Sequence, residues 1–155
     1  MIKIVISLTI GLLAATSTFA GTNTGDVIKG EAAFKKCKAC HGIIADNGKG
    51  AIIVKGGKIG PNLWGIIGRQ AGSYPEYKFG KSIVAAGNAG FLWDETGFLA
   101  YIKNPKTFWR EKLNDPTANS KMAFKMKKSG HDIFAYLLSI SPPPEVNNEV
   151  SSTSD

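Results

Sequence analysis

Two cysteines and a histidine form the part of this sequence whose residue types could do chemistry. The segment reads Cys37-Lys38-Ala39-Cys40-His41, and it contains the only 2 cysteines of the chain. A Cys-x-x-Cys-His pattern is typical of covalent haem attachment. Two cysteines at this spacing on a helical turn can each reach one vinyl group of the same porphyrin, and the next histidine then lies under the iron. The segment therefore predicts one covalently attached haem c, with Cys37 and Cys40 as attachment points and His41 as a metal ligand.

Three other uses of a Cys-x-x-Cys pair are less well supported. A zinc site needs two more ligands, and after His41 the only other histidine is His131. A thioredoxin-like redox pair would follow a buried strand, whereas a helical pattern precedes this one. A short-loop disulfide in an exported protein remains the third alternative. We favour haem attachment because the chain has the start of an exported protein.

Residues 1–20 have the layout of a secretory signal peptide. Lys3 gives a positive start, residues 4–13 are mostly apolar, and Thr18-Phe19-Ala20 precedes the expected cleavage point. The apolar run is shorter than the ~20 residues needed to span a bilayer, so we favour cleavage over a membrane-tethered form. We therefore expect an exported protein of the periplasm, the compartment that suits covalent attachment of a haem.

The mature chain divides into one domain at 21–140 and an acidic tail at 141–155, which we expect to be disordered. The whole sequence carries a net charge of +7. The tail holds three acidic residues and no basic one, so the domain itself is strongly basic. A basic protein in the periplasm meets no nucleic acid. We expect it to dock on acidic protein surfaces, with steering that weakens as salt rises.

The hydrophobic pattern predicts an all-α fold. We expect about four to five short helices wrapped around one cofactor, at 26–38, 95–103 and 130–139, with short helical turns near 62–68 and 81–86. Residues 42–92 are glycine-rich and predict mostly loop, and no segment predicts a strand.

Four local signals set the ends and packing of these helices. Asp26 is a suitable N-cap, and Ser129 with Asp132 predicts a capping pair at the last helix. Asn104-Pro105 predicts the end of the helix before it. Gly30 lies on the same helical face as Phe34, which predicts a close helix crossing there.

The second axial position of the iron has three candidates, because Met1 leaves with the signal peptide. They are Met122, Met126 and His131. Met122 lies in a segment well beyond the Asn104-Pro105 helix end, where a loop could bring its thioether to the far face of a haem. Met126 is four residues further and could compete. His131 falls in the first turn of the last helix, where a surface position is typical.

Nearly the whole domain resembles class I cytochrome c, and most closely the bacterial periplasmic electron carriers of the purple-bacterial type. The matching stretches occur in the order of that family, so no single short motif carries the resemblance. They are residues 25–30 with Phe34, residues 37–41, Gly60-Pro61-Asn62-Leu63, Gly68-Arg69, Trp93, Tyr101, Asn104-Pro105, residues 121–124 and residues 132–137.

The resemblance implies a role for each matching residue. Met122 would be the sixth ligand, and the carbonyl of Pro61 would accept a hydrogen bond from His41. Tyr101 would direct its hydroxyl at the Met122 sulfur. Two further side chains, Arg69 and Trp93, would donate to a haem propionate. Gly30 and Phe34 would pack against the last helix near Tyr136 and Leu137.

The sequence departs from the family at one polar position. Phe79 occupies the place where the family usually has a tyrosine that bonds a propionate, and Tyr77 lies two residues earlier. One propionate would therefore lack a donor, or Tyr77 would replace it.

A haem with both axial positions filled cannot bind a reactant, so we expect an electron carrier and not an enzyme. The resemblance implies a soluble monomer that takes electrons from a cytochrome bc-type complex and delivers them to a terminal oxidase or a photosynthetic reaction centre. Lysines around the haem edge would dock these partners, and they are Lys38, Lys106, Lys121 and Lys125. Two alternatives remain: a dedicated mediator of a periplasmic dehydrogenase or peroxidase, and a gas-binding haem sensor if Met122 is not a ligand.

Overall fold

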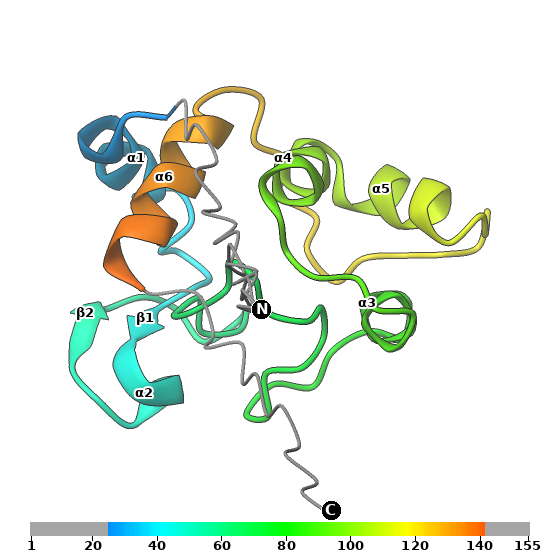
Figure 1. Cartoon of the computed structure of the whole chain (residues 1–155), viewed down its shortest axis with the longest axis horizontal. Coiled ribbons are helices and arrows are strands. Elements are labelled where there is room, and N and C mark those ends of the chain that lie inside the picture. The colour runs from blue at the N-terminus through cyan, green and yellow to red at the C-terminus, as the bar shows by residue number, and fades with distance from the viewer. Residues whose placement is uncertain (1–24, 142–155) are drawn as a thin grey trace, which may run out of the picture.

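The computed structural model describes residues 25–141 (Figure 1). The predicted signal peptide, and all but the first residue of the predicted tail, lie outside the described residues. Within them the elements follow in the order α1 (Val27–Phe34), β1 (Ile43–Ile44), α2 (Ala45–Gly48), β2 (Ile52–Val54), α3 (Lys81–Asn88), α4 (Glu95–Lys103), α5 (Pro105–Lys112) and α6 (Gly130–Ile140). No helix among residues 25–141 is long and apolar enough to cross a membrane.

The first and last helices pack against each other and bring the two ends of the domain together (Figure 1). Gly30 makes this possible, because a Cβ at that position would collide with the Asp132 carbonyl oxygen on α6. The rings of Phe34 and Tyr136 lie 5.5 Å apart between the two helices. The Asp26 backbone N–H also donates to the Asp132 carboxylate over 3.0 Å. The predicted crossing at Gly30 is therefore confirmed.

Helix α1 begins as the sequence predicts and ends sooner. The Asp26 carboxylate accepts hydrogen bonds from the backbone of Ile28 and Lys29, at 2.9 and 3.0 Å, which confirms it as the N-cap. The helix ends at Phe34, and residues 35–40 continue as turns. The helix predicted for 26–38 is therefore four residues too long at its C-terminal end.

The predicted end of the helix 95–103 at Asn104-Pro105 is confirmed, whereas the predicted capping pair of Ser129 and Asp132 is wrong. Pro105 ends α4 and also begins α5, because the first turn of a helix leaves its N–H groups unpaired and proline lacks one. Ser129 does not cap α6 with its side chain, since its backbone is left-handed at φ 63°, whereas capping residues are typically extended. Asp132 bonds Asp26 instead of completing a capping pair.

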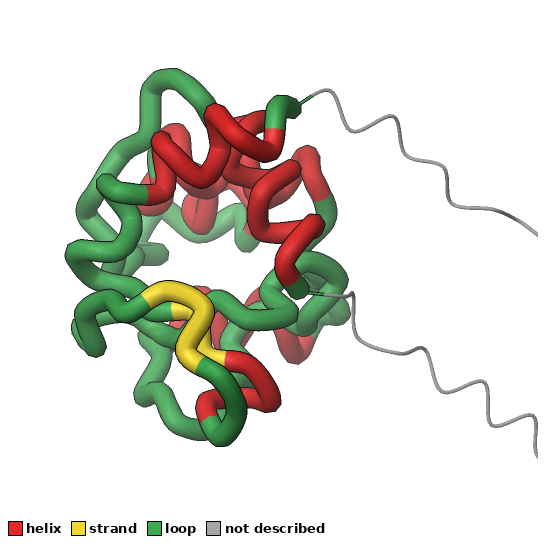
Figure 2. The backbone as a smooth tube through the Cα atoms, turned by 90° about the vertical axis from the view of Figure 1, so that its left-hand side faces the viewer, coloured by secondary structure: helices red, strands yellow, loops and turns green. Residues whose placement is uncertain are grey.

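The glycine-rich middle of the chain is mostly loop, as predicted, with two differences. A short antiparallel hairpin forms where no strand was expected, with Ile43 opposite Val54. No helix forms at 62–68, because Gly65 and Gly68 have positive φ angles of 62° and 79°. The six helices among the described residues lie on more than one side of the molecule, with α2 beside the two strands, and loops join them (Figure 1 and Figure 2). The predicted mainly helical architecture is confirmed.

Candidate functional site

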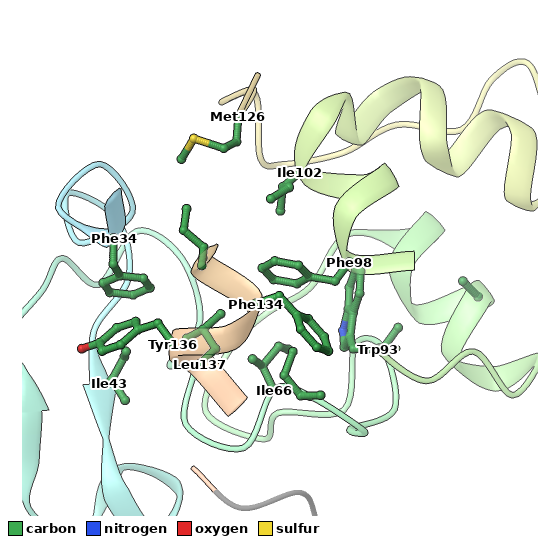
Figure 3. Close-up of a cluster of buried hydrophobic side chains, with 14 of the residues drawn as sticks. Phe34, Ile43, Ile66, Trp93, Phe98, Ile102, Met126, Phe134, Tyr136 and Leu137 are labelled. Atoms are coloured by element: carbon green, nitrogen blue, oxygen red, sulfur yellow. The ribbon is translucent and has the colours of Figure 1, made fainter. Parts of the chain in front are cut away.

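A cavity of about 390 Å³ lies inside the domain and is lined by residues from both ends of the chain. Cys37, Cys40 and His41 line it, and so does the segment 119–124, which contains Met122. Most of the other lining is apolar and comes from the buried cluster, part of which is drawn in Figure 3. These apolar residues include Phe34, Leu63, Ile66, Ile83, Trp93, Phe98, Ile102, Ile133 and Leu137.

The His41 imidazole is held in one orientation and one protonation state. Its Nδ1 lies 2.8 Å from the Pro61 carbonyl oxygen. Because a carbonyl oxygen can only accept, Nδ1 must carry the proton and donate. This leaves Nε2 with a free lone pair. Burial also lowers the pKa of His41, so the ring is neutral at physiological pH. The predicted hydrogen bond from His41 to Pro61 is present, and it prepares the ring to be a metal ligand.

Glycines allow the segment 56–60 to lie directly against the Cys-x-x-Cys-His segment. The backbone N–H of Gly57 donates to the Lys38 carbonyl, and that of Gly60 donates to the Cys40 carbonyl, each over 2.9 Å. A Cβ at Gly60 would fall within 2.6 Å of Nδ1 and 2.7 Å of Nε2 of His41. The imidazole therefore rests on a bare stretch of backbone. The sequence contains these glycines, but nothing in their order indicates which of them touches the ring.

The two cysteines are half-buried free thiols that line the cavity. Burial raises the pKa of the Cys37 thiol to about 11, and the neighbouring Cys40 contributes to the rise. The backbone N–H groups of Cys40 and His41 both donate to the Cys37 carbonyl over 3.0 Å. This turn keeps both sulfurs and the imidazole at one wall, as covalent attachment of a single haem requires.

Both candidate methionines line the cavity, whereas His131 does not. Met122 is half-buried, and its backbone N–H donates to the Ser120 hydroxyl over 3.1 Å. Met126 is 7% exposed and lies beside Ile102, whose carbonyl accepts its N–H at 2.7 Å (Figure 3). His131 is at the surface with its Nδ1 2.9 Å from a Glu95 carboxylate oxygen. The histidine therefore has the surface position that was expected, and either methionine could reach a haem.

Trp93 and Tyr101 both line the cavity. Trp93 is 4% exposed, and its indole ring borders the cavity. The Tyr101 hydroxyl lies 3.2 Å from the Ser120 hydroxyl, and burial raises its pKa. Its hydrogen-bond partner in the structure is Ser120, and its contact with the Met122 sulfur stays a prediction.

Arg69 lies outside the lining of the cavity. Its two terminal nitrogens donate to the backbone carbonyls of Trp64 and Asn62, at 3.0 and 3.1 Å, and its guanidinium stacks over the Tyr74 ring at 5.3 Å. Burial lowers the pKa of Arg69 to about 10. In the structure, the hydrogen bonds of Arg69 stabilise the 62–64 segment. Its contact with a haem propionate stays a prediction.

The contacts of Tyr77 bear on whether it could replace the tyrosine that the family usually has in the place of Phe79. The Tyr77 hydroxyl donates to the Ile59 carbonyl over 3.0 Å, and its ring meets Phe79 edge-on at 4.9 Å. Both rings line the cavity, but the only hydroxyl is already bonded to backbone. Tyr77 is therefore not the free donor that would replace the usual tyrosine.

The rim of the cavity contains both basic and exposed apolar side chains. Lys36 and Lys121 line it, together with Ile59 and Phe124, which are 75% and 44% exposed. The other lysines predicted to dock partners, which are Lys38, Lys106 and Lys125, are exposed but do not line it. Sequence reasoning missed Lys36, Ile59 and Phe124. Each of them lies within two residues of a predicted site residue in the sequence, and this closeness could have indicated a place at the rim.

These observations together fit a haem. The cavity is mostly apolar, it is lined by two thiols and a prepared imidazole, and it is lined by thioethers from a second segment. The residues that would hold the porphyrin and its iron therefore come from segments far apart in the sequence.

The comparisons agree with this assignment, although no family model matches the chain. The chain is 51% identical to cytochrome c2 of Rhodobacter capsulatus over 135 residues, which are 87% of this chain and 97% of that protein. It is 50% identical to cytochrome c-551 of Roseobacter denitrificans over 117 residues, covering 76% of this chain and 82% of that protein. The crystal structure of the Rhodobacter capsulatus protein superposes with a TM-score of 0.72 and 53% identity, covering 75% of this chain and 98% of that one.

Proposed function

This chain belongs to the class I cytochromes c, electron carriers with one covalent c-type haem, and from that premise we propose that His41 and Met122 are its two axial ligands. The haem supplies reversible one-electron transfer between Fe(II) and Fe(III). Class I cytochromes c are generally not enzymes, and we assign no catalytic residue in this chain.

The observation that carries the proposal is the pairing of a locked imidazole with a thioether segment in one cavity. The 2.8 Å bond to the Pro61 carbonyl makes His41 a stronger donor and fixes its ring. Met122 and Met126 lie on the same irregular segment between α5 and α6, and Met122 is the less buried of the two. Met126 is buried in the core, and its backbone N–H is bonded to the Ile102 carbonyl. We therefore choose Met122 over Met126, in agreement with the family resemblance.

The thioether ligand and the remaining lining residues would set the relative stability of the ferrous and ferric states. A soft thioether ligand favours the ferrous state, and an apolar lining that excludes water disfavours the extra charge of the ferric state. Trp93 would donate its indole N–H to a haem carboxylate, since a buried negative charge needs donors. With imidazole and thioether on the metal, no position is left for a reactant.

The visible spectrum of the haem-loaded protein tests the ligand assignment. Wild type in the oxidised state is expected to have the weak absorption band of a sulfur-to-iron bond. Met122→Leu is expected to lose this band, and the matched control Met126→Leu is expected to keep it. Ready binding of carbon monoxide by the reduced wild-type protein at neutral pH would contradict a closed metal centre. Loss of the band in the Met126 variant alone would move the assignment to Met126.

We propose that partners dock at the rim around Ile59 and Phe124. Lys36 lies at this rim, and Lys38 and Lys125 are close to it in the sequence. Together with Lys106 they would steer acidic docking surfaces of membrane redox complexes, namely a cytochrome bc-type complex and an oxidase or reaction centre. Rates of electron transfer with such a partner are expected to fall steeply as ionic strength rises, and rates indifferent to salt would contradict this.

The cellular compartment of the protein is also part of the proposal. We place the mature protein in the periplasm as a soluble monomer, released by cleavage after Ala20. N-terminal sequencing of the exported protein tests this, because a membrane-tethered form would keep residues 1–20.

A further inference from the structure

Three segments meet at the rim of the cavity, and one lysine joins two of them. The Lys121 ammonium donates a hydrogen bond to the Lys78 backbone carbonyl. It also lies 5.7 Å from the centre of the Tyr77 ring. The lysine stem passes over Gly80, where a Cβ would be in ordinary contact with Lys121 Cγ at 3.6 Å. The side chain is therefore folded back on its own protein.

The turn that receives this lysine is itself tied to the segment beneath His41. The Tyr77 hydroxyl donates to the Ile59 carbonyl over 3.0 Å. Ile59 directly precedes Gly60 and Pro61, which support and bond the imidazole. A continuous set of contacts thus runs from the residue next to Met122, through the turn 77–80, to the residues that hold His41.

We infer that Lys121 is a positioning residue that holds Met122 over the cavity, and not one of the docking lysines. The inference rests on the proposed function, in which Met122 binds the iron. Between the ends of α5 and α6 the chain has no regular structure, so side-chain bonds must fix residue 122. One such bond is made by Ser120, on the N-terminal side of Met122. Lys121 adds a charge-assisted bond to a different segment, and bonds of this kind are roughly twice as strong as neutral ones.

Lys125 provides a matched comparison within the same segment. It is exposed, it carries the same charge, and it makes no side-chain hydrogen bond or ion pair to any other described residue. Replacing either lysine by methionine removes one charge near the cavity rim and keeps a similar unbranched stem. Only the change at Lys121 removes a bond to Lys78.

The test is a urea titration of the oxidised, haem-loaded protein with two readouts. The sulfur-to-iron band reports the ligand, and far-ultraviolet circular dichroism reports global unfolding. Lys121→Met is expected to raise the equilibrium constant for loss of the band by about tenfold, the lower end for a hydrogen bond to a charged group. The band should then disappear before the helices unfold. Lys125→Met is expected to leave the band as in wild type, and Lys121→Arg, which keeps a donor, is expected to restore it in part.

Two results would overturn the inference. One is an equal effect of the two methionine variants on the band, which would make Lys121 an ordinary surface charge. The other is a shift of band and circular dichroism together by the same amount, which would make its role merely structural. A wild-type protein without the band would instead refute the ligand assignment of Met122.

Discussion

Replacing Gly60 by alanine is the most direct test of how the backbone supports the haem ligand. The new Cβ would lie 2.6 Å from Nδ1 and 2.7 Å from Nε2 of His41, and carbon atoms do not approach ring atoms this closely. Either the ring or the segment 56–61 must move. Movement of either one lengthens the 2.8 Å bond between His41 and the Pro61 carbonyl.

The expected cost follows from these two effects. Overpacking a well-packed site costs about 1–3 kcal/mol, and losing one hydrogen bond costs about 0.5–1.5 kcal/mol. We therefore expect Gly60→Ala to lower the free energy of unfolding by roughly 2–4 kcal/mol. The haem-loaded protein should also show a changed reduction potential, because a displaced imidazole is a weaker donor.

The assay is urea unfolding followed by tryptophan fluorescence, with Gly80→Ala as the control. A Cβ at Gly80 meets only Lys121 Cγ at 3.6 Å, an ordinary contact. The control is expected to unfold close to wild type. If Gly60→Ala unfolds at the same urea concentration as the control, with an unchanged potential, then the imidazole does not depend on a bare backbone at residue 60.

Two further predictions concern the helices that close the domain. Phe34→Ala should cost about 3–5 kcal/mol, because Phe34 is 2% exposed and packs on Tyr136 between α1 and α6; urea unfolding measures this, and a loss below 1 kcal/mol would mean that α1 does not depend on that contact. Backbone hydrogen bonding, first from Lys29, lowers the pKa of Asp26 below its ordinary value of 3.8. Asp26 therefore adds stability that is fully present above that value and is lost as the pH falls through the lowered pKa. Asp26→Asn should flatten the acid limb of a plot of unfolding midpoint against pH, and an unchanged limb would contradict this.

Much of the fold could be predicted from short stretches of sequence, because the signals were local. Asp26 caps a helix with its own neighbours, and Gly30 with Phe34 marks one helical face. These interactions span a few residues, so their order in the chain determines them. The prediction missed the start of α5 at Pro105 and failed at Ser129, where the same residue type suits two local structures. The surrounding fold decides between them, since α5 needs a start and the chain must turn into α6.

The candidate site likewise has one part that local sequence predicts and another part that depends on contacts between distant segments. The sequence by itself determined the chemistry of residues 37–41, because two thiols and an imidazole on one turn need no other segment to bring them together. Only the tertiary structure decided the partners of Tyr101, Arg69 and Lys121, which are Ser120, two backbone carbonyls of the 62–64 segment and the Lys78 carbonyl. A hydrogen bond acts over about 3 Å, and which groups come that close depends on how distant loops fold around one cavity.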